Sequence, residues 1–306
     1  MPSARALACP VSLKGVLSAR CAAAALAEGL RAWAEADELP LADGGEGTLD
    51  ALHAALGGEW REAGVHDAFG VPRRARWLVV SDGTAVVESA EAIPLDAARL
   101  DPVAASSRGL GELIAATGSP AQLLVCLGGT ATVDGGRGLR EVLDELPAPT
   151  RVACDVDVPL FDAARVFAAQ KGATPAQAAE LERRLAAIEE LRPYRDVPGA
   201  GAAGGLGAAF AALGAELVPG APLVLDLVGF DPGGYDLVVT GEGTVDATTW
   251  RGKAVGEVAR RCRAAGVRCV VFGGRVVDGC DATALSGDTA HAREDLVDLG
   301  RRLGTS

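Results

Sequence analysis

Short apolar runs alternate along this chain with amphipathic stretches, and this pattern predicts strands and helices in turn. Apolar residues that recur at a spacing of three and four residues predict helices. The first helix is expected to begin after Ser18, which is a good N-cap. Further helices are expected near residues 49–56, 109–117, 175–188, 252–265 and 296–303. Strands are expected at the apolar runs 5–9, 38–42, 123–127, 151–155, 236–240 and 268–272.

The clearest helix signal starts at Thr174. Thr174 is a suitable N-cap, Pro175 suits the first turn, and Gln177 completes a capping box. The apolar stripe of this helix contains Leu181 and Leu185, and its other face is rich in charged residues. We interpret that charged face as solvated surface.

The order of elements predicts two domains. Strands and helices alternate at both ends of the chain, which favours a parallel sheet. In the middle, runs 74–80 and 85–88 flank a turn at 81–84 and predict a β-hairpin. We therefore predict an α/β protein, with a Rossmann-like parallel-sheet domain formed by residues 1–60 and 234–306. A second, mixed α/β domain, residues 61–233, is inserted into it.

Composition narrows the classes of function. The 306 residues carry a formal net charge of −12, which disfavours nucleic acid and anionic membranes as partners. No apolar run approaches the roughly 20 residues that span a bilayer, and the first ten residues do not resemble a signal peptide. The seven cysteines form no Cys-x-x-Cys pair. A reduced cytoplasm is expected, and a zinc site is not.

Two acidic glycine-rich stretches, 43–48 and 241–246, suggest a binding site made from both ends of the chain. Each follows a predicted strand and precedes a predicted helix. Such loops gather at the carboxyl edge of a parallel sheet, where ligands bind. Their glycines allow backbone N–H groups to approach an anion, and their carboxylates can hold a cation or accept a proton. Two ordinary tight turns with surface acids remain the alternative.

Residues 199–204 have the spacing G-x-G-x-x-G of dinucleotide-binding loops. That fingerprint needs a strand directly before it, and residues 192–198 do not look like one. Asp226 lies near the distance expected for a ribose-binding acid, so an NAD(P)-dependent oxidoreductase is kept as a remote hypothesis. The alternative is close packing of a small-residue helix. The chain has no P-loop motif and no G-x-S-x-G motif.

An ordered series of short motifs resembles the glycerate kinase family. The matching pieces, in chain order, are 14–15, 43–48, 128–136, 153–160, 170–174, 198–207, 241–246 and 252–253. The resemblance covers nearly the whole chain. It implies a Rossmann-like domain with an inserted α/β domain, and ATP-dependent phosphorylation of glycerate or a related small hydroxy acid in a cleft between them. ATP and Mg²⁺ are the implied cofactors, and a homodimer is left open.

Under this hypothesis, phosphoryl transfer requires positioning, charge neutralisation, a metal and a group that orients the attacking hydroxyl. Asp43 is the candidate base, with Glu46 and Asp155 beside it; Asp43 and Asp155 are the candidate metal ligands. Lys14 could bind a carboxylate or phosphate. The remaining candidates for substrate or phosphate binding are Ser12, Gly44, Gly45, Gly128, Gly129, Thr130, Asp134, Gly241, Glu242, Gly243, Asp246 and Lys253. Asp134, Asp155 and Asp246 could instead serve only as helix caps or turn residues.

Three valines depart from the family pattern. Val11 stands where the family has aspartate, and Val133 and Val158 stand where it has asparagine. All three are expected on loops that line the cleft. Each lost polar group would remove a contact worth about 1–3 kcal/mol. These residues support a second hypothesis, a homologue with a binding or regulatory role and no catalysis.

Overall fold

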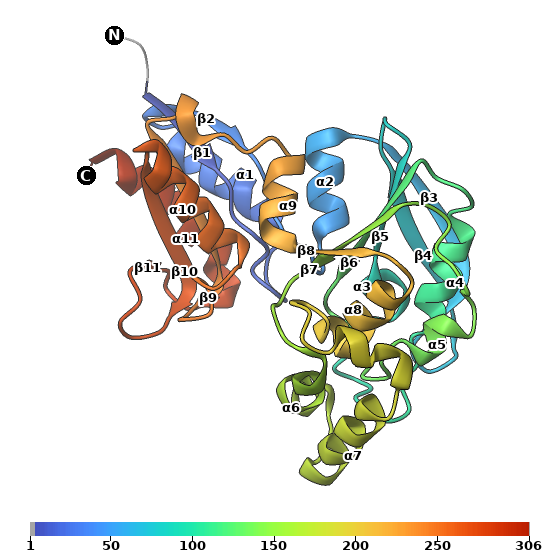
Figure 1. Ribbon diagram of the computed structural model, residues 1–306. Coiled ribbons are helices and arrows are strands. Elements are labelled where there is room, and N and C mark those ends of the chain that lie inside the picture. Colours follow the sequence, from blue (N-terminus) through green and yellow to red (C-terminus); the bar gives the residue numbers. More distant parts are fainter. Residues whose placement is uncertain (1–3, 306) are drawn as a thin grey trace. The chain divides into compact units, whose positions relative to one another are not determined.

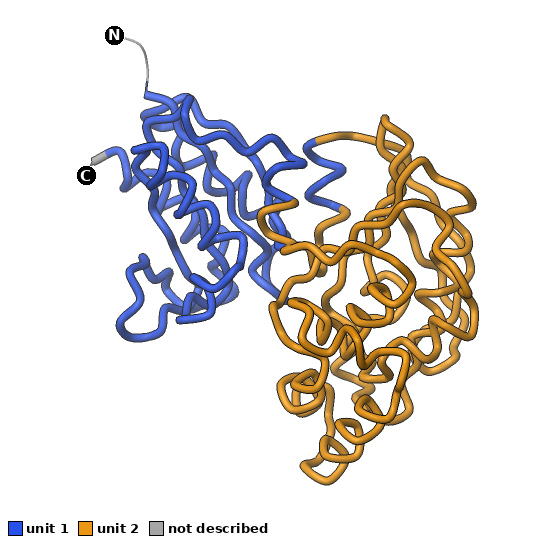
Figure 2. Tube along the Cα trace, viewed as in Figure 1, with its two compact units in different colours: residues 1–43, 50–55, 224–306 blue, residues 44–49, 56–223 orange. Residues whose placement is uncertain are grey.

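The computed structural model describes residues 4–305, which form two compact units (Figures 1 and 2). Unit 1 consists of the chain up to Asp43, residues 50–55 and the chain from Val224 onward. Unit 2 consists of residues 44–49 and 56–223. Both ends of the chain therefore contribute to one unit. The domain limits that we predict, after residue 60 and before residue 234, concern domains that fold independently. They stay a prediction.

Unit 1 is built on a parallel sheet of five strands, in the order β11-β10-β9-β1-β2 (Figure 1). The strands are β1 (Ala4–Ala8), β2 (Ala34–Glu38), β9 (Leu237–Val245), β10 (Arg268–Val276) and β11 (Thr283–Ala284). The helices are α1 (Ala19–Leu30), α10 (Ala254–Ala265) and α11 (Ala292–Arg302). Ser18 caps α1 by accepting a hydrogen bond from the amide of Cys21, as predicted. The core contains Leu26, Leu30, Val239, Phe272 and Leu296.

Unit 2 is built on a mixed sheet of six strands, in the order β3-β4-β5-β6-β7-β8. The first three, β3 (Glu59–His66), β4 (Pro72–Val79) and β5 (Thr84–Glu88), pair antiparallel. From β5 onward, β6 (Gln122–Leu127), β7 (Thr150–Cys154) and β8 (Glu216–Pro219) pair parallel. The structure thus has one parallel and one mixed α/β sheet, which confirms the predicted fold class.

Short helices connect the strands of unit 2. They are α3 (Ser89–Ala92), α4 (Arg108–Ala116), α5 (Arg137–Arg140), α6 (Ala163–Phe167), α7 (Pro175–Ala186) and α8 (Ala202–Ala212). Two helices, α2 (Thr48–Leu56) and α9 (Gly220–Leu227), each contain a boundary between the units. The 3₁₀ helices are η1 (Leu160–Asp162), η2 (Ala169–Lys171), η3 (Glu189–Tyr194), η4 (Pro232–Gly234), η5 (Thr289–His291) and η6 (Leu303–Thr305). The capping box at Thr174 and Gln177 is present, as predicted.

Two strand predictions were wrong. The second strand is β2, residues 34–38, and not 38–42. It lies at the edge of the sheet and is mostly exposed, so it needs no apolar run. In addition, β9 and β10 continue through glycines that were predicted to be loops. A Cβ at Gly241 would lie 2.4 Å from the carbonyl oxygen of Phe272 in β10, so glycine there permits close strand pairing.

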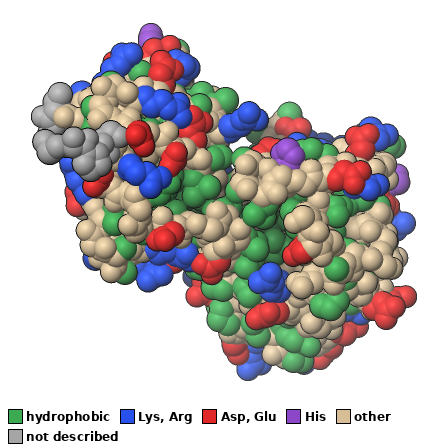
Figure 3. Space-filling model, turned by 90° about the horizontal axis from the view of Figure 1, so that it is seen from above, with side chains coloured by type: hydrophobic (Ala, Val, Ile, Leu, Met, Phe, Trp, Pro, Cys, Tyr) green, Lys and Arg blue, Asp and Glu red, His purple; other side chains and the backbone are tan. Residues whose placement is uncertain are grey.

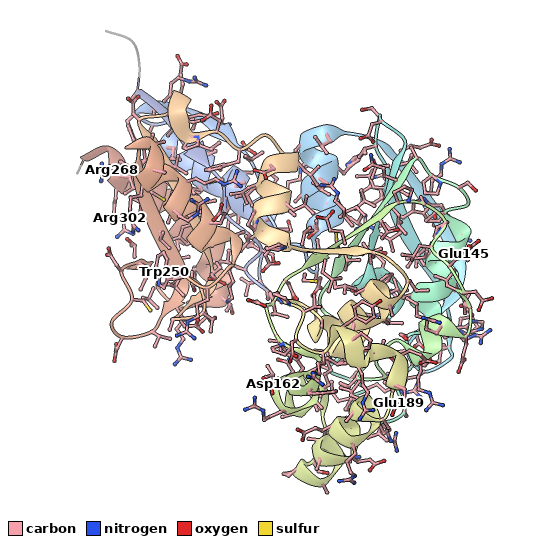
Figure 4. All side chains as sticks on the ribbon, in the orientation of Figure 1. Glu145, Asp162, Glu189, Trp250, Arg268 and Arg302 are labelled. Atoms are coloured by element: carbon pink, nitrogen blue, oxygen red, sulfur yellow. The ribbon has the colours of Figure 1, made fainter. Side chains whose placement is uncertain are left out.

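Charged residues of both signs are interspersed over the face shown in Figure 3. Many of them form local ion pairs; Asp162 and Glu189, labelled in Figure 4, pair with Arg165 and Arg192. The charged face of α7 is exposed, as predicted; the Arg183 side chain is 69% accessible. Across residues 4–305, we find no helix with the length and apolar character needed to cross a bilayer.

Candidate functional site

The first acidic stretch leads from unit 1 into unit 2. Asp43 is the last residue of a unit 1 segment, and Gly44 begins the following unit 2 segment. Gly44 and Gly47 have φ values of +92° and +91°, which only glycine adopts readily. The buried hydroxyl of Thr48 donates to the carbonyl oxygen of Gly45 at 2.7 Å. The stretch is therefore a tight turn that enters α2, consistent with the predicted loop before a helix.

Glu88, at the end of β5, stabilises this turn through hydrogen bonds. Its carboxylate accepts hydrogen bonds from the amides of Gly47, at 3.0 Å, and Leu49, at 3.1 Å. Glu88 is 5% exposed. Its pKa is raised to about 7, mainly by burial; the two amide hydrogen bonds oppose this shift, and the charges of Glu91 and Glu46 add to it. Glu88 is not among the residues predicted from the sequence, although an acid at the end of an apolar strand is a visible signal.

Glycines bring the first acidic stretch, the loop after β6 and the residue after β7 together. A Cβ at Gly128 would lie 2.7 Å from the carboxylate of Asp155 and 2.7 Å from the Cα of Gly45. A Cβ at Gly129 would lie 3.2 Å from the carboxylate of Glu46. Gly128 and Gly129 thus form a cradle between two carboxylates. We call Gly45, Glu46, Gly128, Gly129 and Asp155 the glycine cradle.

This packing makes Gly128 sensitive to any side chain. In Gly128→Ala the new methyl group would overlap the Asp155 carboxylate and the Gly45 backbone, so we expect the cradle to open. For the phosphoryl transfer that the resemblance implies, we predict a loss of activity of about tenfold or more, because small misplacements of catalytic groups cost heavily. Steady-state kinetics with ATP and glycerate measures this loss. Gly64→Ala is the matched control, because a Cβ there meets nothing within 4 Å. Equal activity of the two variants would contradict the prediction.

Two of the groups predicted to bind substrate or phosphate already have partners within unit 2. The amide of Gly128 donates to the hydroxyl of Ser89 at 3.2 Å, and that hydroxyl donates to the carbonyl oxygen of Gly128 at 3.1 Å. The carboxylate of Asp134 accepts hydrogen bonds from Ser107, Gly136 and Gly138. These contacts favour a structural role for Asp134, the alternative that the sequence left open.

In unit 1, the first loop lies beside the second acidic stretch and beside the residues that lead to Asp43. The amide of Val11 donates to the carbonyl oxygen of Gly241 at 3.0 Å, and the amide of Leu41 donates to the carbonyl oxygen of Pro10 at 3.0 Å. A Cβ at Gly243 would lie 3.6 Å from the backbone nitrogen of Lys14. The structure therefore brings the segments that contain Ser12, Lys14, Asp43 and Gly241–Gly243 together. Within this group Lys14 is exposed and Ser12 is half-buried.

The rest of the second acidic stretch forms local contacts. Glu242 accepts hydrogen bonds from the Thr249 hydroxyl, at 2.7 Å, and from the Lys253 ammonium, at 3.3 Å. Asp246 accepts hydrogen bonds from the hydroxyl and the amide of Thr248, which lower the pKa of its carboxyl. Lys253 is thus an ion-pair partner of Glu242, and Asp246 has the contacts of a turn residue.

The three valines have different surroundings. Val133 is 1% exposed and packs in an apolar cluster with Leu160, Leu181 and Leu185. The prediction that Val133 lines a cleft was therefore wrong, since valine suits this buried position. Val11 packs against an apolar cluster that contains Val245 and Val255. Val158 is half-buried, and its carbonyl oxygen accepts the amide of Gly201 at 2.7 Å.

The G-x-G-x-x-G segment serves close backbone packing. It follows η3 and a turn, without the strand that a dinucleotide fingerprint requires. A Cβ at Gly204 would lie 2.1 Å from the carbonyl oxygen of Thr132, and a Cβ at Gly201 would lie 2.5 Å from that of Pro159. Ala203 has a left-handed φ of 51°, at a kink in α8. The packing interpretation is supported, and the oxidoreductase hypothesis loses its basis.

The carboxylates of the glycine cradle fit Mg²⁺ that is bound together with phosphates. Among residues 4–305, no group of three or more His, Cys, Asp or Glu side chains is placed to hold a metal ion. Mg²⁺ is commonly bound by one or two carboxylates together with substrate phosphates. Asp155 supplies a carboxylate near Gly128, and Glu46 supplies one near Gly129.

Comparisons with known proteins identify the family of this chain. The sequence profile of the glycerate kinase family matches residues 6–146 and 143–294. The chain is 36% identical to "Glycerate 2-kinase" of Escherichia coli (strain K12), covering 82% of this chain and 81% of that protein. It is 34% identical to "Glycerate kinase" of Bacillus subtilis (strain 168), covering 87% and 84%.

A solved structure shares the fold. It is the crystal structure of a protein assigned as glycerate kinase 2 from Salmonella typhimurium LT2, with a TM-score of 0.80 and 29% sequence identity. The match covers 99% of this chain and 98% of that one. The family profile spans most of the sequence, and relatives above 30% identity cover more than two thirds of it. This chain therefore belongs to the glycerate kinase family.

Proposed function

We propose that this protein transfers the γ-phosphoryl group of ATP to a hydroxyl of glycerate or a related small hydroxy acid. Membership of the family supports a kinase, and the names of the relatives support glycerate as its substrate. The observation that carries the proposal is the glycine cradle, where two loops that are distant in sequence place carboxylates around a glycine pair.

The chain's own groups suit phosphoryl transfer, which depends on positioning and electrostatics more than on covalent chemistry. Asp43 is the proposed base, which accepts the proton of the attacking hydroxyl. Asp43 is half-buried and directly precedes Gly44 in the chain. Gly44 begins the turn that Glu88 stabilises by hydrogen bonds. Lys14 is exposed at the end of the loop after β1, where its ammonium can bind the carboxylate of the substrate.

Asp155 and Glu46, both in unit 2, are the proposed ligands of Mg²⁺. When bound, Mg²⁺–ATP supplies the phosphoryl group and neutralises part of its charge. Gly129 and Thr130 are proposed to bind a phosphate through their backbone. The amide of Gly128 already donates to Ser89, so Gly128 is not proposed to bind the phosphate through its amide. Its role is to leave room for the phosphate, because it has no side chain.

A non-catalytic homologue is the competing proposal. It rested on three valines, and one of them, Val133, is a buried packing residue. Val11 and Val158 are the remaining support. Val11 also packs against an apolar cluster, which gives it a structural reason.

A coupled ADP-release assay with Mg²⁺–ATP separates the two proposals. Glycerate and other small hydroxy acids are offered one at a time, and protein folding is checked by circular dichroism. We expect ADP release that depends on both the hydroxy acid and Mg²⁺. A folded protein that turns over none of these substrates would contradict the kinase proposal and favour a binding role.

A further inference from the structure

A buried lysine lies directly behind the loop that carries Gly128 and Gly129. Lys171, the last residue of η2, is 4% exposed. Its ammonium donates to the carbonyl oxygen of Thr132 at 2.7 Å and to the hydroxyl of Thr130 at 3.3 Å. Two of its three N–H donors thus hold the segment that follows the glycine pair.

The choice of lysine is informative in this chain. The sequence contains only three lysines, Lys14, Lys171 and Lys253, and the other basic residues are arginines. Of the other two lysines, Lys14 is proposed to bind the substrate, and Lys253 pairs with Glu242. A buried cation is expensive unless it has charged or hydrogen-bonding partners. A lysine used only to fill space would be a poor choice for this position.

Two carboxylates of unit 2, Asp155 and Asp134, act on the charge of Lys171. Burial lowers the pKa of its ammonium to about 8, and the charges of Asp155 and Asp134 oppose that shift. Asp134 is occupied by hydrogen bonds from Ser107, Gly136 and Gly138. Asp155 belongs to the glycine cradle. The positive charge of Lys171 therefore lies where it acts on the cradle.

A second observation concerns Thr132, on the same segment. Its side chain is fully buried, and its hydroxyl has no hydrogen-bond partner among the described residues. Unsatisfied buried polar groups are uncommon and often mark a site that a ligand or water completes. The segment from Gly128 to Thr132 thus combines a glycine pair, a hydroxyl without a partner and a buried cation behind it.

We propose that Lys171 is a positioning residue that holds the Gly128–Thr132 segment in shape for an anionic phosphate and supplies the positive charge that the phosphate needs. This inference rests on the proposed function for the identity of its ligand as a nucleotide polyphosphate. Lys171 acts through Thr130 and Thr132, because it is itself buried. If Lys171 had only a structural role, replacing it in a protein that still folds would leave the affinity of this segment for anions unchanged.

The test uses the full chain and inorganic tripolyphosphate as the probe, at constant ionic strength and without Mg²⁺. Affinity is measured from the rise in the thermal unfolding midpoint with probe concentration. We expect Lys171→Met to weaken binding by about tenfold or more, equivalent to about 1.4 kcal/mol. Lys171→Arg keeps the charge and should recover part of the affinity. Arg183→Met, on the exposed face of α7, is the control and should bind as the unchanged protein does.

Each result has a defined meaning. Unchanged probe affinity in a folded Lys171→Met variant would overturn the proposal. If that variant fails to fold, Lys171→Gln replaces it, since glutamine keeps a donor for Thr132 without the charge. If neither neutral variant folds, Lys171 is structural and the proposal fails. Absence of turnover in the unchanged protein, with probe binding still dependent on Lys171, would contradict the kinase proposal alone.

Discussion

Replacing Asp43 by asparagine is expected to lower kcat by about 10²–10⁴-fold, the range typical of losing a general base. Asparagine has nearly the same shape as aspartate but cannot accept the proton of the attacking hydroxyl. Because Asp43 is only half-buried, the fold should tolerate the change. Coupled kinetics gives kcat, and thermal unfolding reports the fold.

The control is Glu182→Gln on the exposed surface of α7. It makes the same change from carboxylate to amide, remote in sequence from the proposed site residues, and should leave kcat unchanged. If Asp43→Asn turned over within about twofold of the unchanged protein, Asp43 could not be the base, since general-base losses are larger than that.

Glu88 should make stability depend on pH. Its folded-state pKa is about 7, raised from a normal value of 4.5, so the folded protein holds this proton more tightly than the unfolded chain does. This contribution is fully present below about pH 4.5 and is lost as pH rises through about 7. At 1.36 kcal/mol per pKa unit, we expect about 2–3 kcal/mol to be lost between roughly pH 5 and 8.

Glu88→Gln removes this titration. The difference in free energy of unfolding between the unchanged protein and the variant should therefore shrink by about 2–3 kcal/mol from roughly pH 5 to 8. Urea unfolding at several pH values measures it, and Glu182→Gln again serves as the control. A difference that stays constant across this range would show that Glu88 does not titrate there.

Local signals in the sequence predicted local structure well. The capping box at Thr174 and the hairpin between β4 and β5 depend on neighbouring residues, and both are present. The edge strand β2 was misplaced because an exposed strand needs no apolar run. The strands predicted at 236–240 and 268–272 end earlier than β9 and β10 do, because glycine more often marks a loop than a strand.

The candidate site could be predicted only in part. Motif order pointed to Gly45, Glu46, Gly128, Gly129 and Asp155, and the structure brings these residues together. Glu88 and Lys171 were missed because their roles depend on contacts across 41 residues of sequence, to Gly47 and to Thr130. The prediction for Val133 was wrong because this residue, although it lies in a loop between secondary-structure elements, is buried in an apolar cluster.

Direct detection of phosphorylated glycerate is the most direct test of the proposed kinase activity. Phosphorus NMR of a reaction containing Mg²⁺–ATP, glycerate and the protein would follow both products in one sample. A phosphate monoester of glycerate should appear in equal amount to ADP, and its chemical shift and couplings should identify the phosphorylated hydroxyl. ATP that stays intact beside folded protein, or ADP accompanied only by inorganic phosphate, would contradict the proposed kinase.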